Sequence, residues 1–378
     1  MTPNRRACGV STWAGAVAFV LLLGGCATRD SATEPRGLRP AEARARIAEL
    51  LPANLADRAG WATDVHAALS ALRIEPTAPN ICAVLGITEQ ESGFRADPAV
   101  PELPAIAWQQ IEQRARSAGV PVLVVRATLR FPSPDGKSYS ERIDAARTER
   151  ELSEIFDDFI GMVPMGRSLF AGLNPVRTGG PMQVSIEFAE RHAQIRPYPY
   201  PVDGGLRREV FTRRGGLYFG IAHLLDYPVA YDRPIYRFAD YNAGHYASRN
   251  AALQRAISVA SGIPLAADGD LVRHDGAREV GSTEAAARVL GKRIGLSASA
   301  IRRDLEQGQE AGLEETRLHQ RVFALADKLQ GKPLPRAQVP QIELAGAKIT
   351  RKLTTAWFAQ RVEERYRRCL SRAAAKAG

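Results

Sequence analysis

The chain has 378 residues, a formal net charge of +10 and a hydrophobic share of 45 %. This apolar share is that of an ordinary soluble protein, and the length suits one elaborated domain or two domains. The sequence contains no zinc-finger spacing, no RNP-like aromatic pattern and no lysine-rich tract. The positive charge therefore does not predict nucleic-acid binding.

The first residues predict export. Residues 1–7 carry two arginines and no acid, and residues 13–23 form an apolar run that is too short to span a bilayer comfortably. Two glycines then stand directly before Cys26. This order of features predicts a lipoprotein signal peptide over residues 1–25, and its removal takes away two arginines and lowers the net charge from +10 to +8.

The segment that ends at Cys26 resembles bacterial lipoboxes. This resemblance implies a diacylglyceryl thioether and an N-acyl chain on Cys26, which together attach a protein stably to a membrane. Ala27, and not an aspartate, follows the cysteine, and this choice resembles sorting to the outer membrane. Residues 26–39 are polar and predict a flexible tether. The alternative is an ordinary secretory signal or an uncleaved anchor, with Cys26 incidental.

Helical periodicity dominates the chain from Pro40 onward. Leu50 and Leu51 close the first predicted helix. The second is indicated by apolar residues spaced by four, four and three, namely Trp61, Val65, Leu69 and Leu72. Only Val120–Leu129 and Ile342–Ile349 are candidate strands, so an all-β design is not supported.

A further helix carries Glu91 near its end. Cap-type residues begin it at Thr77, and Gly93 is the expected terminator. Glu91 then lies in the last turn on the inward face, where partial desolvation and the helix dipole are both expected to raise the pKa of its carboxyl. A raised pKa suits a general acid that works near neutrality. The alternative is a structural glutamate that is neutralised by an arginine or by hydrogen bonds.

Two cysteines remain for the folded domain. Cys8 leaves with the signal peptide and Cys26 takes lipid, so Cys82 and Cys369 reach an oxidising compartment. They form either a disulfide that ties the C-terminal helix to the core or two separate buried thiols. The sequence leaves both alternatives open because it does not show how closely their Cα atoms approach.

Four short motifs follow one another between residues 91 and 244. They are Glu91-Ser92-Gly93-Phe94, Gly180-Pro181-Met182-Gln183, Gly215-x-x-Tyr218-Phe219 ending in Leu224-Leu225, and Asp240-Tyr241-Asn242-Ala243-Gly244. In this order, ahead of a helical tail, they resemble the soluble lytic transglycosylases. These lysozyme-like enzymes cleave the glycan strands of peptidoglycan.

The resemblance implies a role for each matching residue. Glu91 is the catalytic acid and base that cleaves between N-acetylmuramic acid and N-acetylglucosamine, and Ser92 beside it joins the substrate-binding set. Gln183 contacts the substrate region, Tyr241 donates a hydrogen bond to Glu91, and Asn242 holds the N-acetylated sugar or orders its turn. No partner carboxylate, cofactor or metal is expected, because the acetamido group of the substrate stabilises the cationic centre.

The chain departs from the transglycosylase pattern at the second and fourth motifs. Pro181 stands where leucine is usual, Arg177-Thr178 replaces a Gly-Ala pair, and Asp240 occupies a position usually filled by alanine. Asp240 is the only second acid near the motifs. Glu89, two residues from Glu91 on the same helix, is expected to point elsewhere.

An insertion is predicted at about residues 100–175, because far more residues than usual separate the first two motifs. Helical patterns near Pro104–Ala118 and Ser140–Met162 flank a turn at Pro132–Gly136. The insertion is expected to wall a substrate groove or to cover it. The stretch Tyr198–Pro201 predicts either a lining for a saccharide path or a rigid surface loop.

Taken whole, the chain also resembles the YaiW-like bacterial lipoproteins, a family of unknown function. The expected fold is mainly α, with a lysozyme-like core over residues 40–262 and a C-terminal helical region over residues 263–378. Helices are predicted there at Ala285–Gln307, Glu314–Gln330 and Thr350–Ala375. Two functions stay open: a transglycosylase acting on peptidoglycan, and a non-catalytic envelope lipoprotein that binds glycan, peptide or a partner protein.

Overall fold

The computed structural model describes residues 38–162, 164–273, 280–344 and 352–376. Over these residues the chain is mainly helical, which confirms the predicted fold class at the level of a mainly α protein. Strands within the described ranges are limited to two short antiparallel pairs. The predicted signal peptide, Cys26 and the tether up to residue 37 lie outside the described residues.

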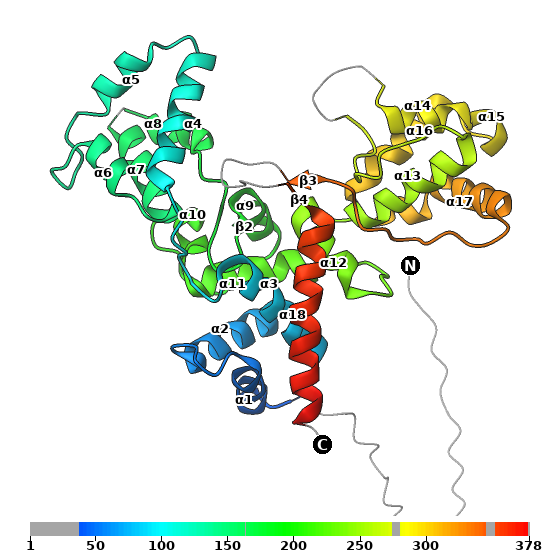
Figure 1. Ribbon diagram of the computed structural model, residues 1–378, viewed down its shortest axis with the longest axis horizontal. Helices are drawn as coiled ribbons and strands as arrows, with labels where there is room; N and C mark the ends of the chain where they lie inside the picture. Colours follow the sequence, from blue (N-terminus) through cyan, green and yellow to red (C-terminus); the bar gives the residue numbers. More distant parts are fainter. Residues whose placement is uncertain (1–37, 163, 274–279, 345–351, 377–378) are drawn as a thin grey trace, which may run out of the picture. The chain divides into compact units, whose positions relative to one another are not determined.

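Figure 1 shows the elements in chain order. The α-helices of the described residues are α1 (Pro40–Leu50), α2 (Arg58–Ala71), α3 (Ala78–Ser92), α4 (Leu103–Ser117), α5 (Val122–Thr128), α6 (Tyr139–Ala145), α7 (Glu149–Gly161), α8 (Gly166–Phe170), α9 (Ile186–Ile195), α10 (Leu206–Val210), α11 (Arg213–Leu225), α12 (Pro234–Ala243), α13 (Ala247–Ser261), α14 (Ser282–Val289), α15 (Gly291–Ile294), α16 (Ala298–Glu306), α17 (Arg317–Gln330) and α18 (Thr355–Ala375). The strands are β1 (Thr178–Gly179), β2 (Val184–Ser185), β3 (Glu343–Leu344) and β4 (Leu353–Thr354), and the 3-10 helices are η1 (Ala171–Leu173), η2 (Gln307–Gln309) and η3 (Ala311–Glu315).

Both predicted N-terminal helices are present. Leu50 is the last residue of α1, and it is buried together with Leu51. The apolar residues at helical spacing in α2 all lie in the core, and Asp57 caps this helix by accepting a hydrogen bond from the Gly60 amide. These two helices form where the sequence places them because each buries one continuous apolar face.

The helix that bears Glu91 packs against the last helix of the described chain. α18 lies along both α3 and α12 (Figure 1), although α3 and α18 are far apart in sequence. The two helices are in contact at Gly86, where a Cβ would lie 3.4 Å from the backbone nitrogen of Tyr366, an ordinary van der Waals distance. A disulfide joins Cys82 of α3 to Cys369 of α18 with a Cα–Cα distance of 5.5 Å, so these cysteines are not two separate thiols.

The region of the predicted insertion is helical, but one expectation is wrong. The expected helices are present as α4, α6 and α7, whereas Val120–Leu129 is not a strand and instead contains α5. Leu123 and Val124 in α5 are 80 % and 54 % exposed, and Thr128 donates to the Val124 carbonyl within the helix. The β-branched residues that favoured a strand therefore find no partner strand, and local hydrogen bonds decide the conformation.

Helices α13 to α17 enclose a second apolar cluster, and Arg249 closes one end of it. Although it is only 1 % exposed, the Arg249 guanidinium donates to the carbonyls of Gly308 and Glu310 at 2.8 and 2.9 Å and lies 4.2 Å over the ring of Tyr246. These contacts replace the water that the guanidinium loses on burial. The cluster itself is apolar and includes Leu253, Ile257, Leu290, Ile301, Leu313, Val322 and Phe323.

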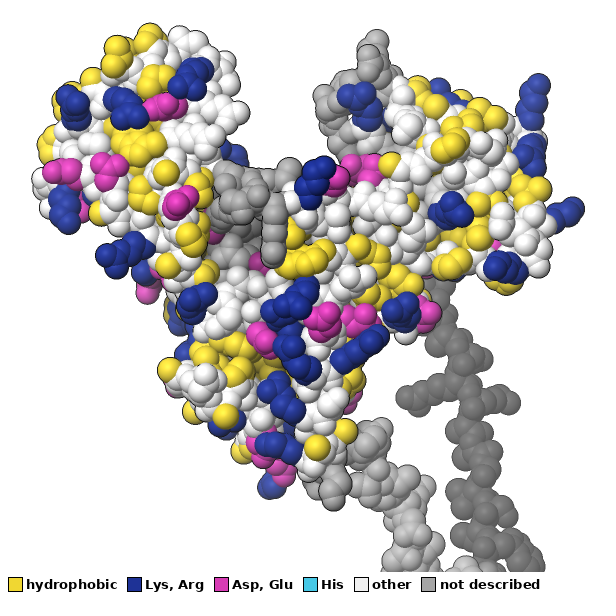
Figure 2. Space-filling model, viewed as in Figure 1, with side chains coloured by type: hydrophobic (Ala, Val, Ile, Leu, Met, Phe, Trp, Pro, Cys, Tyr) yellow, Lys and Arg dark blue, Asp and Glu magenta, His cyan; other side chains and the backbone are white. Residues whose placement is uncertain are grey.

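The candidate strand at Ile342–Ile349 is realised only at its start. Within the described residues, β3 pairs antiparallel with β4 in the register Glu343 to Thr354, and residues 345–351 lie outside the description. In the described part of the chain, no helix has the length and apolar character that a membrane crossing requires. Figure 2 shows basic and acidic side chains interspersed over the visible face, so the net positive charge is not gathered into one patch there.

Candidate functional site

Glu91 lies in the last turn of α3. The helix begins where the Thr77 side chain accepts from the Asn80 amide, and it ends at Gly93, whose φ of 58° is the left-handed conformation that stops a helix. Both ends match the sequence prediction. Glu91 is half-buried, and no basic residue of its own last turn stands beside it.

Ser92 differs from its expected role. The residue is buried, its hydroxyl donates to the Thr88 carbonyl at 3.1 Å, and it accepts from the Arg95 amide at 3.2 Å. As donor and as acceptor, the Ser92 hydroxyl therefore stabilises the end of α3 and the residues that follow it. Ser92 supports the position of Glu91, and the role of substrate contact does not fit its surroundings.

Glu89 points away from Glu91, as the helical geometry predicts. Its carboxylate pairs with Arg368 at 3.0 Å and with Arg365 at 3.5 Å, both on α18. The two glutamates at this end of α3 therefore have different neighbours. Glu89 belongs to the contact between α3 and α18.

The second motif forms the turn between β1 and β2, which pair through Thr178 and Ser185. Gly180 has a φ of 74°, and a Cβ there would lie 2.2 Å from the carbonyl oxygen of Val210 and 3.0 Å from the Cα of Gly216. Only glycine satisfies both the conformation and the approach. Gly216 of α11 also lets the turn lie directly on this helix, since a Cβ there would lie 2.4 Å from Cδ of Pro181.

Gln183 completes this turn with its own side chain. Its φ is 51°, its Nε2 donates to the Gly180 carbonyl at 3.2 Å, and its Oε1 accepts from the Thr178 hydroxyl at 3.3 Å. A contact between Gln183 and a substrate would need the same side-chain amide groups. In the structure they hold an unusual backbone conformation in place.

Tyr241 connects the second motif to Glu91. The residue is buried, and its hydroxyl donates to the Met182 carbonyl at 2.7 Å. Burial, and then the nearby charge of Glu91, raise the pKa of Tyr241 well above its ordinary value. The predicted proximity to Glu91 is present, but the expected hydrogen bond is not: the hydroxyl proton of Tyr241 goes to Met182.

Asn242 is the exposed member of the predicted set. Its Oδ1 accepts from the Thr355 hydroxyl at 2.9 Å, which joins α12 to the first residue of α18. Its Nδ2 makes no hydrogen bond with the described residues. The N–H groups of this amide are therefore the ones that a ligand can use.

Asp240 is a structural acid that the sequence could not distinguish from a second catalytic one. Its buried carboxylate accepts hydrogen bonds from the hydroxyls of Tyr227 and Tyr231 and from the amides of Tyr246 and Ser248, at 2.7 to 3.1 Å. Burial raises the pKa of Asp240, and these donors act against that rise. Both carboxylate oxygens are thus bonded within the protein, so Asp240 holds the turn between α12 and α13.

The buried glutamate Glu209 fixes the position of the Tyr198–Pro201 stretch. Burial alone would raise the pKa of Glu209, but bonds from Arg214 and Tyr198, both 2.6 Å long, outweigh it and leave the pKa below its usual range. The Tyr198 ring also stacks on Phe219 at 5.0 Å. The loop is thus anchored to α11, which agrees with a rigid surface loop.

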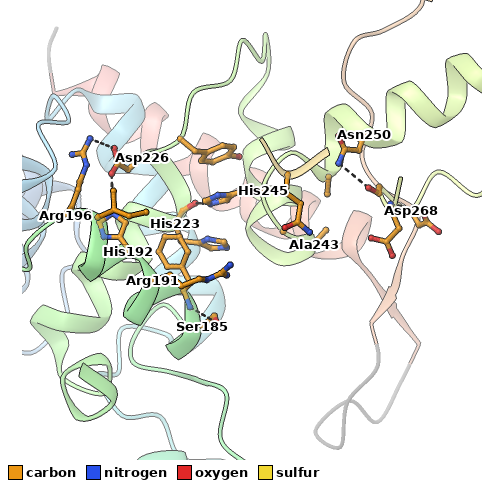
Figure 3. A pocket seen from close by; sticks show the side chains of 18 residues that line it. Ser185, Arg191, His192, Arg196, His223, Asp226, Ala243, His245, Asn250 and Asp268 are labelled. Carbon is orange, nitrogen blue, oxygen red and sulfur yellow. Dashed lines mark hydrogen bonds and ion pairs between the residues drawn. The ribbon is translucent and has the colours of Figure 1, made fainter. Parts of the chain in front are cut away.

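A pocket beside the end of α12 does not include Glu91 among its lining residues. It has a volume of about 630 Å³ and is lined by α9, by the end of α11 and by the turns on either side of α13 (Figure 3). Three of the six histidines of the chain, His192, His223 and His245, stand in its wall. We call this cavity the histidine pocket. No motif singled out these histidines; their concentration within residues 192–245, around the third and fourth motifs, was the available signal.

The histidine pocket is joined to the candidate site by a row of aromatic rings. Tyr227 stacks on His245 with ring centroids 4.1 Å apart, and His245 stacks on His223 at 4.4 Å. The next ring is Tyr241, 4.9 Å from His223. The ring of Tyr241 therefore packs against His223, a residue of the pocket wall.

All three histidines are held neutral. Burial lowers the pKa of each, and for His223 it lowers the pKa to about 3. Each Nε2 faces an acceptor: Asp226 for His192, the Tyr241 carbonyl for His223, and the His223 carbonyl for His245. The single proton of each neutral ring therefore lies on Nε2, and each Nδ1 carries a lone pair.

Residues 54–372 match the model of a family described as a protein of unknown function, DUF1615. Over 351 residues the chain is 52 % identical to the uncharacterized protein YaiW of Escherichia coli strain K12, an alignment that covers 93 % of this chain and 96 % of that protein. No solved structure matches the chain. Neither match names an activity, so chemistry has to be inferred from the residues themselves.

Proposed function

The chain belongs to the DUF1615 family of proteins of unknown function, and from this premise we propose that it is a lysozyme-like lytic transglycosylase of peptidoglycan, anchored to the outer membrane through Cys26. One observation carries the proposal. Tyr241 lies beside Glu91 at the end of α3 and donates its hydroxyl proton to Met182 in the turn of the second motif. Three segments with transglycosylase-like motifs thus meet at one tyrosine.

In the proposed reaction, Glu91 protonates the glycosidic oxygen as that oxygen leaves C1 of N-acetylmuramic acid. The acetamido group of the same sugar stabilises the positive charge that develops at C1. Glu91, now a carboxylate, takes the proton of the O6 hydroxyl while O6 bonds to C1 and closes an anhydro ring. One bond breaks and one forms, no water is consumed, and Glu91 ends protonated as it began.

The neighbours of Glu91 act by positioning. Tyr241 stays protonated because its pKa is raised, so it remains an uncharged donor that fixes Met182. The exposed amide N–H groups of Asn242 suit the acetamido oxygen of an N-acetylated sugar. Gln183 and Ser92 hold the turn and the helix end at which these groups meet.

The test replaces Glu91 by glutamine. Gln keeps the shape of the side chain but cannot donate the proton, so release of anhydromuropeptides from purified sacculi should fall by ~10² to 10⁴. Glu89→Gln is the matched control, because Glu89 lies on the same helix and pairs with α18. It should leave release unchanged. Mass spectrometry of the soluble products measures both variants, with melting temperatures recorded to show that each is folded.

A non-catalytic binding protein is the second candidate, and two observations favour it. The Ser92 hydroxyl is buried, and the Gln183 side chain is bonded back into its own turn, so two of the predicted substrate contacts serve the fold. The same assay separates the candidates. Wild-type protein that binds sacculi and releases no fragment would establish binding, whereas a Glu91→Gln variant that releases as much as wild type would exclude Glu91 as the catalytic acid.

A further inference from the structure

We propose that the segment Val120–Phe131, which contains α5, binds the surface of an anionic phospholipid membrane by placing its exposed apolar side chains among the lipid headgroups. We call these residues the α5 segment. The inference does not depend on the chemistry proposed for Glu91, since the α5 segment contains none of the residues assigned to that site. It adds a contact between the folded protein and a lipid surface to the lipid anchor proposed at Cys26.

α5 is an apolar helix that buries none of its residues. Four of its seven residues are valine or leucine, yet Leu123 and Val124 are 80 % and 54 % exposed. Phe131, which follows the helix, is 59 % exposed. Apolar helices of soluble proteins normally lie in a core, and a group of exposed apolar side chains usually marks a surface that binds a partner or a membrane.

The α5 segment is held in place on the side that faces the protein. Val125 packs against the main apolar cluster, and Leu129 is buried within it. The Ser140 amide donates to the Leu129 carbonyl at 2.8 Å, and the Arg126 guanidinium lies 4.7 Å over the ring of Trp108. The outward position of Leu123 and Val124 is therefore part of the fold, so binding requires no rearrangement of the helix.

The charge around these apolar side chains is positive. Between Glu112 and Asp135 the sequence contains no acid and four arginines, namely Arg114, Arg116, Arg126 and Arg130. Both bounding acids are already paired: Glu112 with Arg126 at 2.5 Å, and Asp135 with Arg142 at 3.6 Å. Arg130 is exposed and forms no ion pair with an acid of the described residues. An anionic lipid surface is complementary to this charge.

The polar groups of α5 favour a membrane over a protein partner. Thr128 is the single uncharged polar side chain of the helix, and its hydroxyl donates to the Val124 carbonyl at 2.9 Å. The Leu129 amide donates to the Val125 carbonyl at 3.0 Å. The helix thus offers a protein partner few groups for specific recognition, whereas satisfied hydrogen bonds, apolar side chains and arginines are the combination that binds at the membrane interface. Figure 2 shows hydrophobic and basic side chains together over the part of the molecule where Figure 1 draws α5.

The test places an environment-sensitive nitrobenzoxadiazole label in the full-length protein through Leu123→Cys. Cys82 and Cys369 are joined in a disulfide and do not take the label. Leu329→Cys is the matched control, because Leu329 is also an exposed leucine of a helix, at 52 %. Any label on Cys26 is common to both proteins. Each protein is mixed with an excess of vesicles of phosphatidylcholine alone or of an equal mixture of phosphatidylcholine and phosphatidylglycerol.

The label at residue 123 should shift its emission to the blue with the mixed vesicles and much less with phosphatidylcholine alone. The label at residue 329 should respond to neither. In the Leu123→Cys protein, Val124→Ser and Arg130→Gln should each raise the lipid concentration at half-maximal response by about fivefold. Arg317→Gln, which changes an exposed arginine of α17, should leave that concentration unchanged.

Three results would overturn the proposal. Equal responses of the labels at residues 123 and 329 would assign the exposed apolar side chains to a protein partner instead. Equal responses of the first label to neutral and anionic vesicles would remove the role of charge. Val124→Ser and Arg130→Gln proteins that behave like Arg317→Gln would remove the assignment to α5. Melting temperatures show that each variant is folded, and release of anhydromuropeptides is measured separately, so either proposal can fail alone.

Discussion

Reduction of the disulfide between Cys82 and Cys369 is expected to remove a large part of the free energy of unfolding. The cysteines are 287 residues apart in sequence. In the chain-entropy model, a crosslink that closes a loop of this length destabilises the unfolded chain by about 5 to 6 kcal/mol. Folded domains are typically stable by about 5 to 15 kcal/mol, so the reduced protein should lose roughly a third or more of its stability.

The assay compares urea unfolding of the oxidised wild type with that of the same protein after reduction under nitrogen. The sequence is unchanged, so the crosslink is the only difference between the samples. Both cysteines are buried, at 0 % and 1 % exposure, so a Cys82→Ala, Cys369→Ala variant shows how much packing adds to the effect. If the oxidised and reduced forms differ by less than about 1 kcal/mol, the loop-entropy reasoning fails for this chain.

Three further predictions address the anchor, the pocket wall and the second motif. Cys26→Ser should abolish lipid attachment and membrane fractionation while leaving the melting temperature unchanged; unaltered membrane partition would exclude lipidation at this residue. His223 has a folded pKa of about 3 against 6.5 for the free side chain, so the stability it contributes is present above pH 6.5 and is lost as the pH falls, by about 2 kcal/mol between pH 7 and 5. Urea unfolding at pH 7 and at pH 5 gives the free energy of unfolding of the wild type and of His223→Gln. The difference between the two proteins should be smaller at pH 5 by that amount, and an unchanged difference would contradict a neutral buried imidazole. Gly216→Ala should destabilise the fold by about 1 to 3 kcal/mol, because its Cβ would lie 2.4 Å from Pro181 Cδ, whereas Gly172→Ala, with open space around it, should not; equal melting temperatures would contradict the close approach.

Local signals made the helix of Glu91 predictable. Its start depends on the Thr77 cap and its end on Gly93, and both act through hydrogen bonds or backbone angles within a few residues. The different directions of Glu89 and Glu91 follow from helical geometry alone, since residues two apart lie on different sides of a helix. The motifs also placed Tyr241 near Glu91, since a matching order of segments carries information about which of them meet.

The features that could not be predicted from the sequence depend on contacts between residues that are distant along the chain. Asp240 has the composition of a catalytic acid, and only its four donors in the folded chain identify it as structural. The hydroxyl of Tyr241 was expected to bond to Glu91, and its bond to the Met182 carbonyl instead depends on how distant segments pack. In α5, β-branched residues favoured a strand, but no strand of the described residues lies beside them.

The pairing of α3 with α18 has a consequence for when the site can form. Residues 355–369 are synthesised almost three hundred residues after the helix that carries Glu91, and α3 lacks its main packing partner until then. Contacts of such long sequence separation form late in folding. The covalent link between the two helices also requires an oxidising compartment. A chain still in the ribosome therefore lacks α18 beside α3, and a chain that is complete but reduced lacks the covalent link between these two helices.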